Sequence, residues 1–430
     1  MTYQETINYL FTRLPMFSRI GAAAYKKDLH NTLALCSYLD NPHKKIKTVH
    51  IAGTNGKGSV SHMLAAIFQT AGYKTGLYTS PHLKDFRERI RVNGSMVRED
   101  YVVSFVERIQ PTIDTIDPSF FEITVAMAFD YFVEEKVDIA IIETGLGGKY
   151  DSTNIITPEL SVITNIGWDH MNILGNSLEE IAGEKAGIIK PGIPVVIGET
   201  LPETKEIFVQ TAQNANSPII FASEQRKAID WKYESAELVT EVVKTGTDEK
   251  NFYHLDLPGI YQTKNLITVL EAVHQLHLKG WGLQETQVKN GLRKTKKLTG
   301  LHGRWEVIRH HPDIVLDVAH NEAGIQQVLL QLELLEPAHL HIVIGMVKDK
   351  DIDKVLAMLP SYARYYFTQA RIPRALDANM LQLQAKSFNL QGEAYTDVND
   401  AVKAALSAAK NDDLILVCGS VFVVGEVIID

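Results

Sequence analysis

The sequence has little cysteine, no excess of positive charge and no long uninterrupted hydrophobic run. Its two cysteines, Cys36 and Cys418, lie in apolar stretches, which favours reduced core residues of a cytoplasmic protein over a disulfide framework. A net charge of −9 excludes a nucleic-acid-binding surface and does not favour a membrane surface. The N-terminal stretch carries Glu5 and has no signal-peptide core, and glycines interrupt the apolar stretch from Leu414, which predicts a buried strand and helix and no membrane span.

The remaining composition is that of an ordinary globular protein, with 45% hydrophobic and 22% charged residues. A length of 430 residues is enough for two or three domains. A basic run at 294–297, followed by Thr299 and Gly300, predicts a linker. We therefore expect one domain over residues 1–297 and a second over 298–430, in a monomeric protein.

The most informative stretch is 46–72. A β-branched run predicts a buried strand at 46–51, and apolar residues at helical spacing follow from Val60 to Ala71. The turn between them contains Gly53, Thr54, Asn55, Gly56, Lys57, Gly58 and Ser59. Glycines let backbone N–H groups approach a phosphate, and a helix N-terminus and a lysine add positive charge. The alternative, a glycine turn with a solvated lysine, does not account for the agreement of loop, strand and helix.

Polar residues follow three further predicted strands. Ser80 follows a strand that ends at Thr79, Glu143 follows the apolar run 137–142, and His170 comes after the strand 160–166. Ligands bind at the carboxyl ends of parallel strands, and this mixed oxygen and imidazole set suits Mg²⁺ or Mn²⁺ near phosphates. Taken one at a time, a glutamate that ends a strand by chance and a structural histidine are common alternatives.

Three other features have both a structural and a functional interpretation. Lys185 lies among small and apolar residues in a helix predicted over 177–190, where a lysine usually extends to solvent. Phe120 and Phe121 open a predicted helix and on pattern alone are more often core than binding site. The arginine-rich run 87–91 suits an anionic substrate tail or a solvated face.

Seven motif segments in order resemble the folylpolyglutamate synthase and dihydrofolate synthase family of the Mur ligase superfamily. They include G-T-N-G-K-G-S, T-S-P-H-L followed by F-R-E-R-I, E-T-G-L-G-G, I-A-G-E-K-A-G-I-I-K and D-V-A-H-N, and the resemblance spans about residues 50–425. It implies an α/β protein in which a Mur-ligase-like P-loop ATPase domain precedes a smaller Rossmann-like α/β domain. The absence of G-x-G-x-x-G argues against a dinucleotide.

The resemblance also implies roles for individual residues. Lys57, His170 and Lys185 are the catalytic set, with Lys185 carbamylated by CO₂, and the metal ligands are Ser80, Glu143 and His170. The implied nucleotide contacts are the loop Gly53 to Ser59, Asn265, Arg304, Asp317 and His320. The implied substrate contacts are Pro81, His82, Ser119, Phe120, Phe121, Glu122, Tyr150, Asp151 and Ser152. In the segment K-Y-D-S-T-N, Lys149 and Tyr150 depart from the usual arginine and aliphatic residue. The match at Arg19 and Gly21 is loose, and a surface loop is the alternative there.

The activity implied is ATP-dependent addition of L-glutamate to folates and to dihydropteroate, through an acyl phosphate, with release of ADP and phosphate. Mg²⁺ is the expected metal, with K⁺ as a further candidate cation. A folylpolyglutamate synthase without the dihydropteroate activity is one alternative. Another Mur-type amino-acid ligase, acting on a cell-wall nucleotide precursor, is a second. A non-enzymatic nucleotide-binding module is a third.

Overall fold

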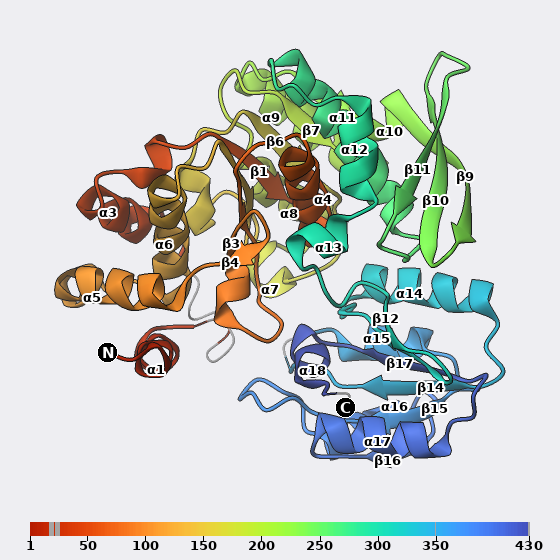
Figure 1. Cartoon of the computed structure of the whole chain (residues 1–430). Helices are drawn as coiled ribbons and strands as arrows, with labels where there is room; N and C mark the ends of the chain where they lie inside the picture. The colour runs from red at the N-terminus through yellow and green to blue at the C-terminus, as the bar shows by residue number, and fades with distance from the viewer. Residues whose placement is uncertain (17–20, 22–25, 349, 429–430) are drawn as a thin grey trace. The chain divides into compact units, whose positions relative to one another are not determined.

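The computed structural model of the chain describes residues 1–16, 21, 26–348 and 350–428. It divides into two compact units (Figure 1). Unit 1 comprises Met1–Asp256 and Gln262–Leu301, and unit 2 comprises Leu257–Tyr261 and His302–Asp430. Both units combine helices with a largely parallel sheet, so the predicted α/β class is confirmed. Among the described residues, we find no helix with the length and apolar character needed to cross a membrane.

The main sheet of unit 1 has eight strands. In spatial order they are β4 (Ser95–Met96), β3 (Ile90–Val92), β2 (Thr75–Tyr78), β5 (Ile139–Glu143), β1 (Thr48–Ala52), β6 (Leu160–Ile163), β7 (Val195–Ile197) and β8 (Ile219–Phe221). The pairs β2–β3 and β3–β4 are antiparallel and the remaining pairs are parallel. The central strands β1, β5 and β6 are buried throughout, as expected of parallel strands covered on both faces.

Helices of unit 1 lie on both faces of this sheet (Figure 1). They are α1 (Tyr3–Arg13), α3 (His30–Tyr38), α4 (Lys57–Thr70), α5 (Glu99–Ile116), α6 (Phe120–Glu134), α7 (Met171–Leu174), α8 (Leu178–Ala186), α9 (Pro202–Asn214), α10 (Ala222–Gln225), α11 (Gln262–Leu278), α12 (Glu285–Leu292) and α13 (Thr295–Thr299), with short 3₁₀ turns η2 (Pro42–Lys44), η3 (Phe86–Arg89) and η4 (Ser152–Ile155). The helix predicted over 177–190 is shorter in the structure, because Gly187 caps α8. The linker predicted at 294–297 is wrong, because Lys294 is the N-cap of α13 and 295–297 lie within that helix.

A second sheet of unit 1 is antiparallel and contains β9 (Arg226–Glu234), β10 (Glu237–Lys244) and β11 (Lys250–Leu255). Unit 2 has a six-stranded sheet in the order β12 (Glu306–Arg309), β13 (Asp313–Leu316), β17 (Leu414–Cys418), β14 (Leu340–Ile344), β15 (Arg364–Phe367) and β16 (Gly392–Ala394). Only its β12–β13 pair is antiparallel among the described strands. Its helices are α14 (Glu322–Leu335), α15 (Ile352–Met358), α16 (Ala378–Lys386), α17 (Val398–Ala408) and α18 (Val421–Glu426). The strand and helix predicted from Leu414 are confirmed as β17 and α18.

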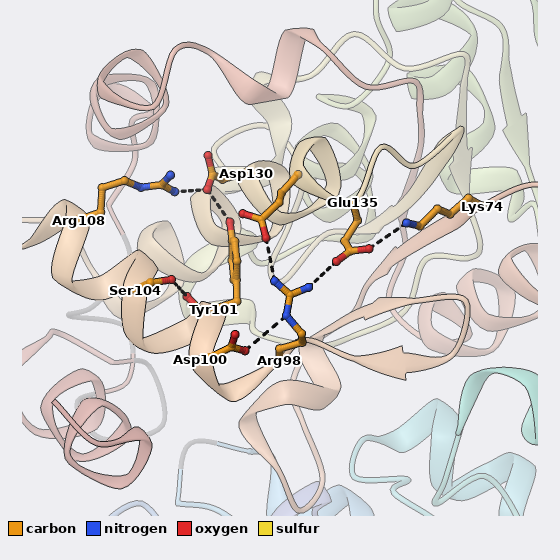
Figure 2. A network of polar contacts seen from close by, with 9 residues as sticks. Lys74, Arg98, Asp100, Tyr101, Ser104, Arg108, Asp130 and Glu135 are labelled. Atoms are coloured by element: carbon orange, nitrogen blue, oxygen red, sulfur yellow. Dashed lines mark hydrogen bonds and ion pairs between the residues drawn. The ribbon is translucent and has the colours of Figure 1, made fainter.

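A polar network joins α5 to the end of α6 (Figure 2). Arg98 contacts Glu134 at 2.9 Å and Glu135 at 2.6 Å, and Lys74 contacts Glu135 at 2.9 Å. One turn further along α5, the Tyr101 hydroxyl donates to Asp130. These contacts lie beside the apolar cluster that α1, α3, α5 and α6 build against the sheet.

Candidate active site

Four loops meet along one edge of the main sheet. Ser80 follows β2, Glu143 ends β5, Gly53 follows β1, and Thr164 follows β6. These strands are consecutive neighbours in the order β2–β5–β1–β6 and run parallel. Their carboxyl ends therefore bring the loops together at the place where α/β sheets bind ligands.

The loop after β1 needs glycine at two positions. Gly53 has φ +146°, and a Cβ there would lie 1.9 Å from Thr164 Oγ1. Gly56 has φ +83°, and a Cβ there would lie 2.3 Å from Asn265 Oδ1. Because a side chain fits neither the backbone conformation nor the space, the loop stays tight against β6 and α11.

Lys57 opens helix α4, and its Nζ donates to the carbonyl oxygens of Gly53 at 2.9 Å and Thr54 at 3.1 Å. The N-cap residue, Gly56, has no side chain with which to cap the first turn. The N-terminal amides of a helix and a nearby ammonium group both attract anions. This geometry suits the predicted phosphate loop, and its contact with a nucleotide stays a prediction.

Ser59 is buried in the first turn of α4, and its Oγ accepts a hydrogen bond from Gln262 Nε2 at 3.1 Å. The amide oxygen of Gln262 in turn accepts from Asn265 Nδ2 at 2.8 Å. The structure thus brings the two predicted nucleotide residues Ser59 and Asn265 together through a side chain that sequence analysis missed. No motif marks Gln262, which is fully buried at the start of α11.

Two residues after β6 also hold the loop and were not predicted. Asn165 Oδ1 accepts from the Asn55 N–H at 2.8 Å, and Thr164 Oγ1 donates to the Asn55 carbonyl at 2.5 Å. Asn165 also accepts the Thr54 N–H through its own carbonyl. Thr164 and Asn165 lie near the end of the strand predicted over 160–166, and that position could have marked them as site residues.

The predicted metal ligands come from three loops of this edge. Glu143 is buried at the end of β5, and the hydroxyl of the adjacent Thr144 is buried without a hydrogen-bond partner in the described part of the chain. His170 is the N-cap of α7, with φ +49°. Among the described residues, no group of three or more His, Cys, Asp or Glu side chains could hold a metal ion by itself. Mg²⁺ commonly binds through one or two carboxylates, water and substrate phosphates, so a hydroxyl from Ser80 and the Glu143 carboxylate fit it.

The glycine-rich loop after Glu143 is folded around Asp151. The Oδ2 atom of Asp151 accepts the N–H groups of Gly145 and Leu146, both at 2.8 Å, and Oδ1 accepts from the N–H and hydroxyl of Thr153. Asp151 is buried, and burial raises its carboxyl pKa despite these hydrogen bonds. Its four acceptor positions are thus used within the chain. Direct contact of this carboxylate with a substrate remains a prediction.

Lys185 lies on α8, directly behind this loop. A Cβ added to Gly148 would lie 2.9 Å from the Lys185 carbonyl oxygen, and Lys149 N–H donates to the Glu184 carbonyl at 2.8 Å. Lys185 is only 4% exposed, so it does not extend to solvent as the common alternative predicted. Burial, and secondarily the charge of Lys57, lower the pKa of Lys185 to about 7.

The aromatic residues at the start of α6 differ in position. Phe120 belongs to the buried core, whereas Phe121 is partly exposed and packs against Tyr78 and Gly145. Ser119 and Glu122 form the capping box of α6, with the Ser119 N–H donating to Glu122 Oε2 at 2.6 Å. The structure therefore explains Ser119 and Glu122 by helix capping. Of the four predicted substrate residues at 119–122, Phe121 is the most accessible.

Arg89 and Phe11, both missed as site residues, surround His82. Arg89 Nε donates to His82 Nδ1 at 2.8 Å, and the Phe11 ring stacks on the imidazole with centroids 6.1 Å apart. Burial and the charge of Arg89 lower the pKa of His82 to about 3, so its ring is neutral. The arginine-rich run is accordingly not a fully solvated face, because Arg89 and Arg91 are buried.

The other predicted substrate residues flank the same loops. Pro81 is exposed, Ser152 is buried in η4, and Tyr150 is half-buried under the Lys149 ammonium, which lies 5.2 Å from its ring centroid. Gly21 has φ +61°, and Arg19 lies outside the described residues.

Three predicted nucleotide residues belong to unit 2. Asp317 is buried, and its Oδ2 accepts from the Tyr261 hydroxyl at 2.7 Å and the Trp305 N–H at 2.8 Å. Burial raises the Asp317 pKa, and the nearby charge of Arg304 opposes that rise. His320 Nδ1 donates to the Val318 carbonyl at 2.9 Å, which orients the ring in the loop between β13 and α14.

Comparisons with known proteins give a consistent family. The Mur ligase middle domain matches residues 51–273, and the Mur ligase glutamate ligase domain matches 303–421. The chain is 34% identical to the dihydrofolate synthase/folylpolyglutamate synthase of Bacillus subtilis, over 99% of this chain and 98% of the relative. It is 30% identical to the folylpolyglutamate synthase of Lacticaseibacillus casei, with the same coverage.

A solved structure of Mycobacterium tuberculosis folylpolyglutamate synthase, complexed with ADP and AMPPCP, superposes with a TM-score of 0.87. Its sequence is 30% identical, and the match covers 99% of this chain and 97% of that one. Family models, full-length relatives and fold therefore agree with the site geometry. The chain belongs to the Mur ligase family, among its dihydrofolate synthase/folylpolyglutamate synthase members.

Proposed function

We propose that this protein is an ATP-dependent, ADP-forming ligase that adds L-glutamate to reduced folates and also to dihydropteroate. One observation carries the proposal. Lys57 stands at the start of α4, which has no side-chain cap, and its charge acts on the buried Lys185 of the same unit. The relatives' names support the same reaction, and the bound ADP and AMPPCP of the Mycobacterium protein support the nucleotide.

The chemistry follows from what amide formation requires. A carboxylate is a poor acyl donor at neutral pH, so phosphorylation by ATP must first convert it to an acyl phosphate. Lys57 and the loop amides stabilise the charge on the transferred phosphoryl group, and a bound Mg²⁺ supplies further neutralisation of that charge. The amine of L-glutamate then attacks the acyl carbon, and phosphate leaves.

We assign ATP and folate binding to residues 1–297 and further nucleotide and glutamate contacts to 298–430. Metal binding by Ser80, Glu143 and His170 and carbamylation of Lys185 belong to the same proposal, as do nucleotide contacts of Arg304, Asp317 and His320. We also propose a cytoplasmic monomer. The two buried, reduced cysteines suit a reducing compartment.

Product analysis tests the function. Purified protein is incubated with ATP, Mg²⁺, L-glutamate and either dihydropteroate or a reduced folate, and the products are identified by mass spectrometry. We expect one added glutamate per ADP released with each acceptor. A product formed only from the reduced folate would indicate a folylpolyglutamate synthase without the dihydropteroate activity. ADP release only with a sugar-nucleotide acceptor would indicate another Mur-type ligase. ADP release without any amide product would contradict the proposal.

A further inference from the structure

A buried chain of hydrogen bonds connects strand β1 with the glycine-rich loop after β5. His50, on β1, has its Nε2 2.8 Å from Thr153 Oγ1, and that hydroxyl lies 2.5 Å from Asp151 Oδ1. All three side chains are buried, and His50 and Thr153 are completely enclosed. These hydrogen bonds therefore run from β1 to the loop after β5 without access to water.

The chemistry of the three groups fixes the direction of these bonds. The Thr153 hydroxyl has one proton, and the adjacent Asp151 carboxylate can only accept it when ionised. Thr153 Oγ1 must then accept from His50, so the imidazole is protonated on Nε2. Consistently, His50 Nδ1 has no hydrogen-bond partner among the described residues. Burial, with a smaller effect from the charge of Lys190, lowers the pKa of His50 to about 3 and keeps the ring neutral.

The far end of the chain holds the loop in place. The Oδ2 atom of Asp151 binds the N–H groups of Gly145 and Leu146. A Cβ at Gly145 would lie 2.4 Å from the Phe121 ring, so the loop has no space to move toward that ring. Rotation of the Asp151 carboxylate would release the two amides and alter the surface that Phe121 and the loop present.

We propose that His50 is a positioning residue for the pteridine-bearing substrate, acting through Thr153 and Asp151 on the loop 144–148. The identity of that substrate rests on the proposed function, whereas the hydrogen-bond chain exists in the ligand-free protein. His50 precedes Gly53 of the phosphate loop by three residues, yet its hydrogen bond goes to Thr153 in η4 and, through Asp151, to the loop 144–148. Its loss therefore affects the folate substrate more than ATP.

Paired substitutions separate this role from simple packing. Thr153→Val and His50→Leu remove a donor and should raise KM for dihydropteroate or reduced folate about tenfold, as expected for loss of a hydrogen bond that ends on a charged group. Thr153→Ser and His50→Gln keep a donor at the same place, so KM for these substrates should stay close to that of the unsubstituted protein. The matched control is Thr48→Val on the same strand, because the buried Thr48 hydroxyl has no partner in the described part of the chain.

We expect KM for ATP to stay within about twofold in all five variants, because the phosphate loop keeps its own contacts. Three results would overturn the proposal. They are a rise of KM for ATP as large as that for the folate substrate, an equal rise of the folate KM in Thr48→Val, and a Thr153→Ser variant whose folate KM rises as much as that of Thr153→Val. If His50→Leu does not fold, the Thr153 pair decides alone.

A spectroscopic measurement tests the chain without activity. Imidazole ¹⁵N shifts of the ligand-free protein, assigned by comparison with His50→Gln, should show the His50 proton on Nε2. A proton on Nδ1 would overturn the proposal. If the protein has no ligase activity, the proposed function fails, and this measurement still reports on the hydrogen-bond chain.

Discussion

The buried amine of Lys185 lies within the electrostatic field of the Lys57 ammonium. Burial is the larger cause of its low pKa, and Lys57 adds to it, while the carboxylates of Asp169, Asp151 and Glu184 act in the opposite direction. The lysine side chain is thus held where its neutral form is accessible near pH 7. Carbamylation requires that form, since CO₂ reacts with an unprotonated amine.

We predict that activity depends on CO₂ through Lys185. At a pKa of about 7, roughly half of the amine is neutral at pH 7, compared with a very small fraction of an ordinary lysine. Lys185→Ala should lose activity, and acetate should partly restore it by supplying a carboxylate. Mass spectrometry under bicarbonate should detect a CO₂ adduct that the variant lacks. An unmodified Lys185 in a fully active enzyme would contradict the prediction.

The same pKa predicts how stability varies with pH. Between pH 7 and 10.5 the unfolded chain binds more protons at Lys185 than the folded chain does, so this group makes stability increase with pH across that window. Below pH 7 both states are protonated, and the unfavourable contribution of the buried charge is complete. Lys185→Met should therefore raise Tm most below pH 7, with a difference that shrinks toward pH 10.5. Melting curves in CO₂-free buffer measure this, and a pH-independent difference would refute it.

Local patterns predicted much of the sheet edge. The positions of the glycine turn before α4, of Glu143 and of the buried strands could be predicted. A strand, a glycine turn and a helix are each encoded within a few consecutive residues. Ser119 and Glu122 were assigned to substrate, although S-x-x-E ahead of an apolar helix is also the signature of a capping box. The structure shows the capping hydrogen bonds.

Contacts between distant segments were not predictable. Gln262 reaches Ser59 over 203 positions of sequence, and His50 reaches Thr153 over 103. Neither glutamine nor histidine carries a local pattern that names its partner, and their burial follows only from how α11 and η4 pack on the sheet. For the same reason the burial of Arg89 was not predicted, since an arginine-rich run suits either an anionic substrate tail or a solvated face.

Lys57→Ala should abolish turnover while the protein stays folded. Loss of one preorganised charge from a phosphoryl-transfer site should lower the rate on the order of 10² to 10³-fold. Lys57 also ties two loop carbonyls, so KM for ATP should rise as well. ADP release measures the effect, with the exposed Lys205→Ala as the control. Near-normal ADP formation by a folded Lys57→Ala protein would end the phosphate-loop assignment.

The network of Figure 2 should contribute unequally to stability. Arg98 is about half exposed, and such ion pairs contribute roughly 0–1 kcal/mol, so Arg98→Ala should cost less than about 1 kcal/mol. Tyr101 is buried, and Tyr101→Phe removes its hydrogen bond to Asp130 at a cost of about 1 kcal/mol. Arg108 still contacts Asp130 in that variant, which limits the cost. Urea unfolding of both variants gives the two values, and ligase activity should not change in either.

Asp151 tests whether the enzyme uses both acceptors. Dihydropteroate lacks the glutamate tail, so its binding depends on the pterin and benzoate rings, whereas a tetrahydrofolate gains contacts through its tail. Since Asp151 holds the loop beside Phe121, Asp151→Ala should raise KM for dihydropteroate more than KM for tetrahydrofolate. A suitable control is Asp256→Ala, because Asp256 is also a largely buried carboxylate that accepts backbone N–H groups, at the start of α13. It should leave the ratio of the two KM values unchanged. Equal effects of Asp151→Ala on both acceptors would show that the loop does not discriminate between them.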